Sequence, residues 1–186
     1  MVCRFTLAIV LGLYLAGHGA AQDLNTVRDD QINRLKNYVL AAIRPNGLVR
    51  DSVVLANPNG SFHPATPDAA GFALLSLAAF DELGKLPDAE ARTEQVLKAY
   101  AGQVAGVTPD RSADGHFVHF MNVSNGAYAT SWDRSYTPIG TALLITGAQF
   151  AAKHFSDNAN IAALANQLTN SVNFNNAIHP NLGGGI

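Results

Sequence analysis

The fold is decided by the stretch DGHFVHFMNVSNGAYATSWDRSYTPIGTALLITGAQFAAKHF, which covers residues 114–155. Its first half concentrates aromatic residues and histidines and contains the dipeptide Asn125-Gly126, a strong signal for a two-residue β-hairpin turn because both residues tolerate positive φ. Its second half opens on Thr137-Pro138, a helix cap followed by a residue suited to the first helical position. The residues that follow are apolar, nearly uncharged and too numerous for a strand. The stretch therefore predicts a short hairpin and then a core helix.

Four other segments carry apolar residues at the three- and four-residue spacing of a helix. With the helix above, the expected helices cover residues 23–44, 67–83, 87–104, 138–155 and 158–174. The second and fourth are apolar on nearly all sides, whereas the other three are amphipathic. This alternation is expected of two helical layers whose inner helices are covered on every side. The sequence predicts an all-α fold of about five helices, with the short β-hairpin between the third and the fourth.

The N-terminal segment has the pattern of a secretory signal peptide: Arg4, an apolar run, and small residues that end near a cleavage site at Ala21 or Gln22. The apolar run is about a dozen residues long, short of the roughly 20 needed to span a bilayer, so a retained anchor is the less favoured alternative. The one cysteine, Cys3, lies inside the signal, so no disulfide is expected in the mature chain. We expect residues 1–22 to be removed from a secreted or periplasmic protein that no longer contacts the membrane.

Charge and composition narrow the classes of partner. The chain has 12 basic and 14 acidic residues, and charged residues make up 14% of it, against an average of about 25%. No cluster of lysine and arginine occurs, which argues against nucleic acid and anionic membranes as partners. The remaining residues, 23–186, suffice for one closely packed helical domain.

Four motifs follow one another along the chain: GLVRD at 47–51, AGFAL at 70–74, GHFVHF at 115–120, and WD at 132–133 followed by TALLITGA at 141–148. In this order they resemble the glucoamylase-like, or glycoamylase-like, domain family, which includes bacterial endo-β-1,2-glucanases. The resemblance implies an (α/α)6 toroid, glycoside hydrolase activity and a glucan substrate, such as β-1,2-glucan. Such a toroid has twelve helices, so residues 23–186 would form its N-terminal part.

The resemblance carries over one catalytic acid. Trp132 and Asp133 match the family motif, but Ser135 stands where family members have a glutamate and Gly140 where they have an aspartate. Hydrolysis of a glycosidic bond normally needs two positioned carboxyl groups. Asp133 is therefore the predicted catalytic residue, in a set of acids that is smaller than the family pattern.

The resemblance also implies substrate-binding residues around Asp133. They are Trp132, Asp51, Arg50, His116, His119 and Phe120. Each has a plainer interpretation: a solvated loop charge for Arg50-Asp51, and ordinary packing for the aromatic residues and histidines. Two other acids are interpreted as structural, Asp68 as a helix cap and Asp114 as a turn former.

The two histidines of the hairpin argue against a metal site. His116 and His119 lie three positions apart in an extended run, so their side chains are expected on opposite faces of the backbone. We therefore expect no metal ion and no other cofactor.

Three functions remain open at this point. The leading hypothesis is a secreted carbohydrate-active protein that resembles glycoside hydrolases acting on glucans. The alternative is a catalytically inactive carbohydrate-binding protein or truncated remnant of that family, and a third is a helical secreted interaction protein without a sugar ligand. Because an incomplete toroid exposes apolar flanks of its inner helices, self-association through those flanks is also expected.

Overall fold

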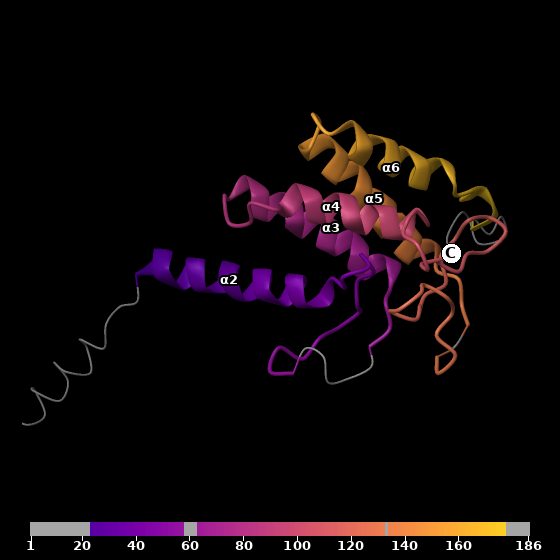
Figure 1. The fold of residues 1–186 in the computed structure, drawn as a ribbon, viewed down its shortest axis with the longest axis horizontal. Coiled ribbons are helices and arrows are strands. Elements are labelled where there is room, and N and C mark those ends of the chain that lie inside the picture. The colour runs from indigo at the N-terminus through magenta and orange to yellow at the C-terminus, as the bar shows by residue number, and fades with distance from the viewer. Residues whose placement is uncertain (1–22, 58–62, 133, 178–186) are drawn as a thin grey trace, which may run out of the picture. The chain divides into compact units, whose positions relative to one another are not determined.

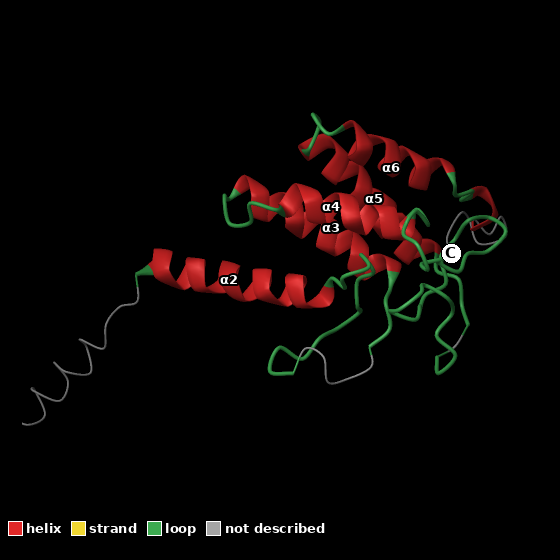
Figure 2. Cartoon of the chain, viewed as in Figure 1, coloured by secondary structure: helices red, strands yellow, loops and turns green. Residues whose placement is uncertain are grey.

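The computed structural model describes residues 23–57, 63–132 and 134–177. These residues form five α-helices and one short 3-10 helix, joined by loops (Figures 1 and 2). The elements are α2 (Leu24–Ala42), α3 (Pro67–Glu82), α4 (Ala89–Tyr100), α5 (Pro138–His154), α6 (Ala159–Asn170) and η1 (Asn175–Ala177). The chain divides into two compact units, Met1–Leu35 and Lys36–Ile186, with the boundary inside α2. All packing described below lies within the second unit. The predicted signal peptide, residues 1–22, lies outside the described residues.

Helices α3 to α6 form two layers. The helices of the inner layer, α3 and α5, pack on each other along much of their length, and the outer helices α4 and α6 cover α3 and α5 respectively (Figure 1). A smaller contact joins α4 to α6. The all-α fold, the number of helices and their two layers are therefore confirmed.

The starts of α3 and α5 are specified by the same local chemistry. The Thr66 hydroxyl oxygen accepts a hydrogen bond from the Ala69 amide at 3.3 Å, and the Thr137 hydroxyl oxygen accepts one from the Gly140 amide at 3.0 Å. A proline follows each threonine and lacks the amide hydrogen that a first-turn residue would leave without a partner. Both predicted starts are confirmed, and the Asp68 side chain makes no cap, because Thr66 is the cap.

Two glycines let α3 and α5 approach backbone to backbone. A Cβ atom added to Gly71 would lie 2.3 Å from the Leu143 carbonyl oxygen, and one added to Gly147 would lie 2.4 Å from the Gly71 carbonyl oxygen. These distances are shorter than any van der Waals contact. The glycines therefore set the spacing of the inner layer.

The N-terminal ends of α3 and α5 lie side by side. Gly140, in the first turn of α5, is so close to α3 that an added Cβ atom would lie 3.1 Å from the Pro67 ring. Because the loops that precede both helices end at this place, the glycine contact between the helices also brings those loops together.

The predicted hairpin differs from the structure. In the described part of the chain, pairing outside the helices consists of isolated antiparallel bridges, one of which joins Met121 to Tyr128. The connecting turn has four residues between Asn122 and Ala127, and its only positive φ angle is that of Gly126, at 78°. The two-residue turn expected at Asn125-Gly126 was wrong because Asn125 keeps a negative φ angle.

The inner helices are not covered on every side, contrary to the prediction from their composition. Phe72 on α3 is 57% exposed, and Ile139 and Phe150 on α5 are 62% and 52% exposed. Each inner helix contacts one outer helix, α3 with α4 and α5 with α6. Exposed apolar flanks of this kind are those expected when inner helices lack further neighbours.

We predict that Gly147→Ala lowers the free energy of unfolding by about 2 kcal/mol, because the added methyl group must push α3 away from α5. Helix propensity alone would change stability in the opposite direction, by about 1 kcal/mol in favour of alanine. Urea unfolding followed by circular dichroism measures the difference. Thr146→Ala, at the exposed neighbouring position of α5, is the matched control and should leave stability nearly unchanged. A Gly147→Ala protein more stable than the wild type would contradict the proposed contact.

Candidate functional site

A ladder of backbone bridges gathers four loop segments near the N-terminal ends of α3 and α5. Arg50 pairs with Ala65, Ala65 with Met121, and Met121 with Tyr128. The Ala65 and Met121 amides exchange hydrogen bonds of 2.8 Å with each other's carbonyl oxygens. A further bridge, from Val118 to Tyr136, attaches the segment that leads into α5. The ladder brings together residues from Arg50 to Tyr128, and several predicted site residues lie in or next to the segments that it joins.

The Tyr100 side chain anchors the ladder to α4. Its hydroxyl group donates a hydrogen bond to the Thr66 carbonyl oxygen at 2.9 Å and accepts one from the Val49 amide at 3.4 Å. The ring contacts Phe117 edge-on, with 5.7 Å between centroids, and is fully buried. Burial raises the pKa of the Tyr100 phenol because the phenolate form would lose its hydration.

Three aromatic side chains of the site form a continuous aromatic stack, His119–Phe120–Trp132. The His119 and Phe120 rings stack with centroids 4.1 Å apart and planes at 19°, and Phe120 meets Trp132 at 4.5 Å and 38°. His119 and Phe120 are half-buried, whereas Trp132 is 39% exposed. The last ring of the stack is therefore the Trp132 indole, which packs against Phe120 and is partly exposed to solvent.

Beside the stack lies a polar cluster, Asp110–Arg134–Tyr136. Arg134 Nη2 is 3.0 Å from Asp110 Oδ2 and 3.3 Å from the Tyr136 hydroxyl oxygen, and the Tyr136 hydroxyl group donates a hydrogen bond of 3.4 Å to Asp110 Oδ1. The Asp110 carboxylate, and then Tyr136, raise the pKa of Arg134. Tyr128 joins the cluster to the stack, because the Arg134 guanidinium lies 5.5 Å from its ring centre and its hydroxyl group donates to the Trp132 carbonyl oxygen.

The other predicted residues are placed differently. His116 is 6% exposed and packs edge-on against Phe174 at 5.2 Å, so it does not belong to the aromatic stack. Neither of its ring nitrogens hydrogen-bonds to a described residue. The two histidines thus contact different rings, His116 that of Phe174 and His119 that of Phe120. The predicted catalytic residue, Asp133, lies outside the described residues.

Arg50 and Asp51 occupy one end of the ladder. The Arg50 side chain is 6% exposed, and the pKa of its guanidinium is lowered by burial and, to a smaller extent, by Arg44. The Asp51 side chain is exposed, while its amide donates a hydrogen bond of 2.8 Å to the Pro64 carbonyl oxygen. Arg50 is therefore part of the core of this loop region, and the carboxylate of Asp51 is the accessible charge.

Asp110 was not predicted from the sequence. Between Pro109 and Arg111 it resembles an ordinary turn residue, and its partner Arg134 lies 24 positions away. The Val118 amide donates to the Asp110 carbonyl oxygen at 3.0 Å, and this contact places Asp110 in the site. No local sequence pattern encodes that pairing.

The two positions that depart from the family pattern also have defined surroundings. Ser135 is exposed, and its carbonyl oxygen accepts a hydrogen bond from the His119 amide at 2.8 Å. Gly140 is buried, and a Cβ atom added there would lie 2.9 Å from Thr137 Cγ2. An aspartate at position 140 would therefore displace the residue that caps α5.

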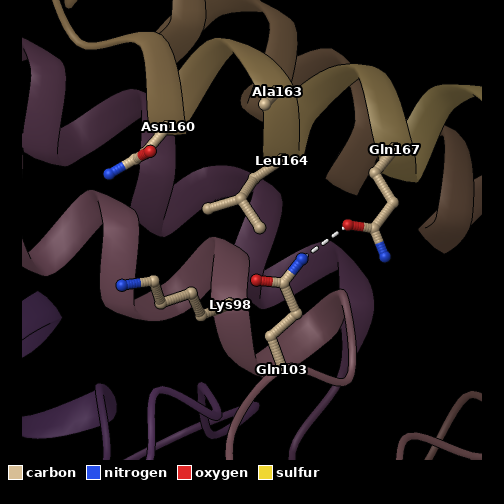
Figure 3. A pocket seen from close by; sticks show the side chains of 6 residues that line it. All are labelled: Lys98, Gln103, Asn160, Ala163, Leu164 and Gln167. Atoms are coloured by element: carbon tan, nitrogen blue, oxygen red, sulfur yellow. Dashed lines mark hydrogen bonds between the residues drawn. The ribbon is translucent and has the colours of Figure 1, made fainter.

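The pockets of the second unit include two that lie away from these residues. One, of about 240 Å³, lies between α4 and α6, where the Gln103 side chain donates a hydrogen bond of 2.7 Å to Gln167 (Figure 3). Another, of about 290 Å³, is apolar and lies between α5 and the segment that contains Phe174 and Ala177. Neither contains a residue of the aromatic stack or the polar cluster.

Within residues 23–57, 63–132 and 134–177, no group of three or more histidine, cysteine, aspartate or glutamate side chains could hold a metal ion. None of the helices described is long and apolar enough to cross a membrane.

Comparison with known proteins supports the fold. No protein-family model matches the sequence, and no curated protein matches it. A solved structure does: the crystal structure of a "putative glucoamylase" from Bacteroides fragilis matches 83% of this chain with a TM-score of 0.66. The two sequences are 20% identical, and this chain spans 37% of the length of that protein. The likeness shows that this chain has an all-α fold resembling part of a glucoamylase-like toroid.

The buried Tyr100 phenol makes stability sensitive to alkaline pH. In the folded protein its pKa is raised, whereas the unfolded phenol ionises near its ordinary value of 10.0, so the folded state holds its proton where the unfolded state has lost it. Stability should be unaffected by this group below pH 10 and fall above it, by about 1.4 kcal/mol at pH 11. Urea unfolding of wild type and Tyr100→Phe at pH 8 and pH 11 measures the effect, which the substitution should abolish. Tyr38→Phe, at a partly exposed tyrosine, should preserve the alkaline loss, and equal behaviour of the two variants would argue against the assignment.

Proposed function

We propose that this chain is part of a secreted carbohydrate-active protein of the glucoamylase-like type, and that it holds a glucan against the aromatic stack. The observation that carries the proposal is the geometry of Trp132, whose indole is 39% exposed and stacks on Phe120. Sugar rings present apolar C–H groups on their faces, which pack against flat aromatic rings. An indole already held in place loses little conformational entropy when a sugar binds to it.

The fold gives independent support to a carbohydrate ligand. The Bacteroides fragilis protein with a similar fold is titled a "putative glucoamylase". The resemblance of the motifs around Arg50, Phe120 and Trp132 to endo-β-1,2-glucanases adds a candidate linkage. We therefore propose a glucan, with β-1,2-glucan as the first linkage to test. Because this chain spans 37% of that protein, further parts of a complete toroid would contribute to the full binding surface.

Hydrolysis would use Asp133 as its first carboxyl group. Glycosidases pair two such groups across the bond that is cleaved, and Asp110 is the carboxylate that the structure places in the polar cluster beside Trp132. Both Asp110 oxygens are occupied, however: Oδ2 accepts a hydrogen bond from Arg134, and Oδ1 accepts one from Tyr136. Asp110 therefore orients Arg134 in this structure, and the second carboxyl group of a hydrolytic pair is not evident in the described part of the chain.

This observation favours a second candidate function, carbohydrate binding without hydrolysis. Ser135 and Gly140 replace two acids of the family pattern. A side chain at position 140 would require Thr137 to shift, because an added Cβ atom would lie 2.9 Å from Thr137 Cγ2. A protein that retained the aromatic stack but lost these acids would bind a glucan and leave it intact.

We predict that Trp132→Ala weakens binding of gluco-oligosaccharides by about tenfold or more, since roughly 1–3 kcal/mol of apolar contact is removed. Isothermal titration calorimetry with β-1,2-, β-1,3-, β-1,4- and α-1,4-linked oligosaccharides measures the affinity. Phe150→Ala, which removes an aromatic ring that is 52% exposed on α5, is the matched control and should bind like the wild type. Absence of binding to every oligosaccharide, or equal binding by the Trp132→Ala protein, would refute the proposed site.

The two functions are separated by the release of reducing ends from the same glucans. If the protein is a hydrolase, Asp133→Asn should reduce the rate by about a hundredfold or more while binding persists. If it binds without hydrolysis, the wild type and the variant should both bind and neither should release reducing sugar. Release that is unchanged in Asp133→Asn would contradict the catalytic assignment.

Secretion and self-association complete the proposal. The composition of residues 1–22 supports export, with a mature N-terminus near Ala21 or Gln22.

The exposed Phe72, Ile139 and Phe150 support association of two copies through the α3 and α5 layer. Sedimentation equilibrium should then detect a dimer that Phe72→Ser weakens, and a monomer at all concentrations would exclude it.

A further inference from the structure

We propose that Arg134 recognises an acidic group on the bound saccharide, so that the preferred ligand is a glucan that carries carboxylates. This inference rests on the proposed carbohydrate function and specifies the class of ligand. It follows from the geometry of the polar cluster.

The Arg134 guanidinium group has unused hydrogen-bonding capacity. Its contacts with Asp110 and Tyr136 both involve Nη2. No described residue accepts a hydrogen bond from its Nη1 or Nε atoms, and the side chain is 56% exposed. A guanidinium group carries five N–H donors in one plane, so those not used by the protein remain available to a ligand.

The guanidinium group is held in place, although it is exposed. Its central carbon lies 5.5 Å from the ring centre of Tyr128 and 6.0 Å from that of Tyr136. Its partner Asp110 is fixed by the backbone, because the Asp110 amide donates to the Gly126 carbonyl oxygen at 3.0 Å and its own carbonyl oxygen accepts from Val118. The Asp110 side chain is only 19% exposed. Such preorganisation lowers the entropy cost of binding a charged ligand.

Another exposed ion pair of this chain shows what a purely local pair looks like. Arg92 and Asp88 lie four positions apart around the start of α4, and Arg92 contacts Asp88 Oδ2 at 2.8 Å. The Arg92–Asp88 pair has no aromatic neighbour among the described ring contacts, whereas two tyrosine rings flank Arg134. Arg92 therefore serves as a matched control for Arg134.

The charge of Arg134 lies next to the surface on which the sugar would rest. Arg134 is two positions after Trp132, and Tyr128 contacts both, since its ring faces the guanidinium group and its hydroxyl group bonds to the Trp132 carbonyl oxygen. Tyr128 thus joins the segment that carries the exposed indole to the guanidinium group of Arg134, which is paired with Asp110 through Nη2 alone. Hydroxyl groups of a neutral glucan can accept hydrogen bonds from Arg134 but supply no opposite charge.

A carboxylate is the group that best fits this cation. The planar guanidinium group matches the two oxygens of a carboxylate, and hydrogen bonds between charged partners are about twice as strong as neutral ones. In a glucan, oxidation of the sugar at C6 places a carboxylate at the edge of the ring, where it projects past an indole that stacks on the ring face. A sulfate ester would offer the same charge with a tetrahedral arrangement of oxygens.

The test compares each gluco-oligosaccharide of the panel above with the same oligosaccharide oxidised at C6 and with its 6-sulfate. Titration calorimetry of the wild-type protein should give affinities for the oxidised form about tenfold higher than for the neutral parent. The preference should shrink as salt is raised from 50 to 500 mM, because an exposed ion pair is screened. If the sulfated form binds as tightly as the oxidised form, Arg134 recognises negative charge regardless of the shape of the group. That result would overturn the preference for carboxylates.

Arg134→Gln should abolish the preference, because it lowers the affinity for the oxidised form by about tenfold more than the affinity for the neutral parent. Arg92→Gln should leave both affinities unchanged. Thermal unfolding of each variant checks that it is folded. A wild-type protein that binds neutral and oxidised forms equally, with binding still dependent on Trp132, would overturn this inference and leave the proposed function intact. Absence of binding to every form would overturn both.

Discussion

The structure depends on the contact between Gly71 and Gly147, where α3 and α5 meet without intervening side chains. The position of Gly140 against Pro67 shows that the N-terminal ends of both helices lie together. Each start is fixed by a threonine cap and a proline, so the loops that enter the two helices have defined end points. Close helix packing thereby determines where the loops of the candidate site converge, and functional residues on loops need such a rigid support.

The loops are ordered by backbone hydrogen bonds that stop short of a regular sheet. The bridges through Ala65 and Met121, both fully buried, join segments from different parts of the chain. Tyr100 connects this ladder to α4. The partly buried Arg111 donates a hydrogen bond to the Tyr100 carbonyl oxygen at 2.6 Å, and its guanidinium group lies 4.0 Å from the Phe117 ring centre. Burial lowers the pKa of Arg111 to about 10. The result is a buried polar and aromatic foundation beneath an exposed aromatic stack, an arrangement that supports ligand binding at a fixed surface.

The helices could be predicted from the sequence because neighbouring residues specify them. The contacts between loops could not be predicted, because they join residues that are far apart in the sequence. Thr137 and the apolar spacing after it define a helix from neighbouring residues alone, so the helix starts and the two layers could be predicted. The prediction of a two-residue turn at Asn125-Gly126 was wrong, because the bridge between Met121 and Tyr128 sets the length of the turn. The ion pair between Asp110 and Arg134 spans 24 positions and depends on the folded loops. The apolar composition of α3 and α5 indicated complete burial, but the small number of helices predicted that their flanks would be exposed, as they are.

The central claim is that a saccharide rests on the Trp132 indole, and this residue offers a direct probe because it is the one tryptophan of the chain. Its fluorescence should be measured during titration with the neutral and C6-oxidised gluco-oligosaccharides. We expect a saturable change in intensity and a shift of emission to shorter wavelength, because a stacked sugar excludes water from the exposed part of the indole. The half-saturation point should equal the calorimetric dissociation constant. Calorimetric binding of a saccharide with unchanged Trp132 emission, or no binding by protein with intact helical circular dichroism, would contradict the account.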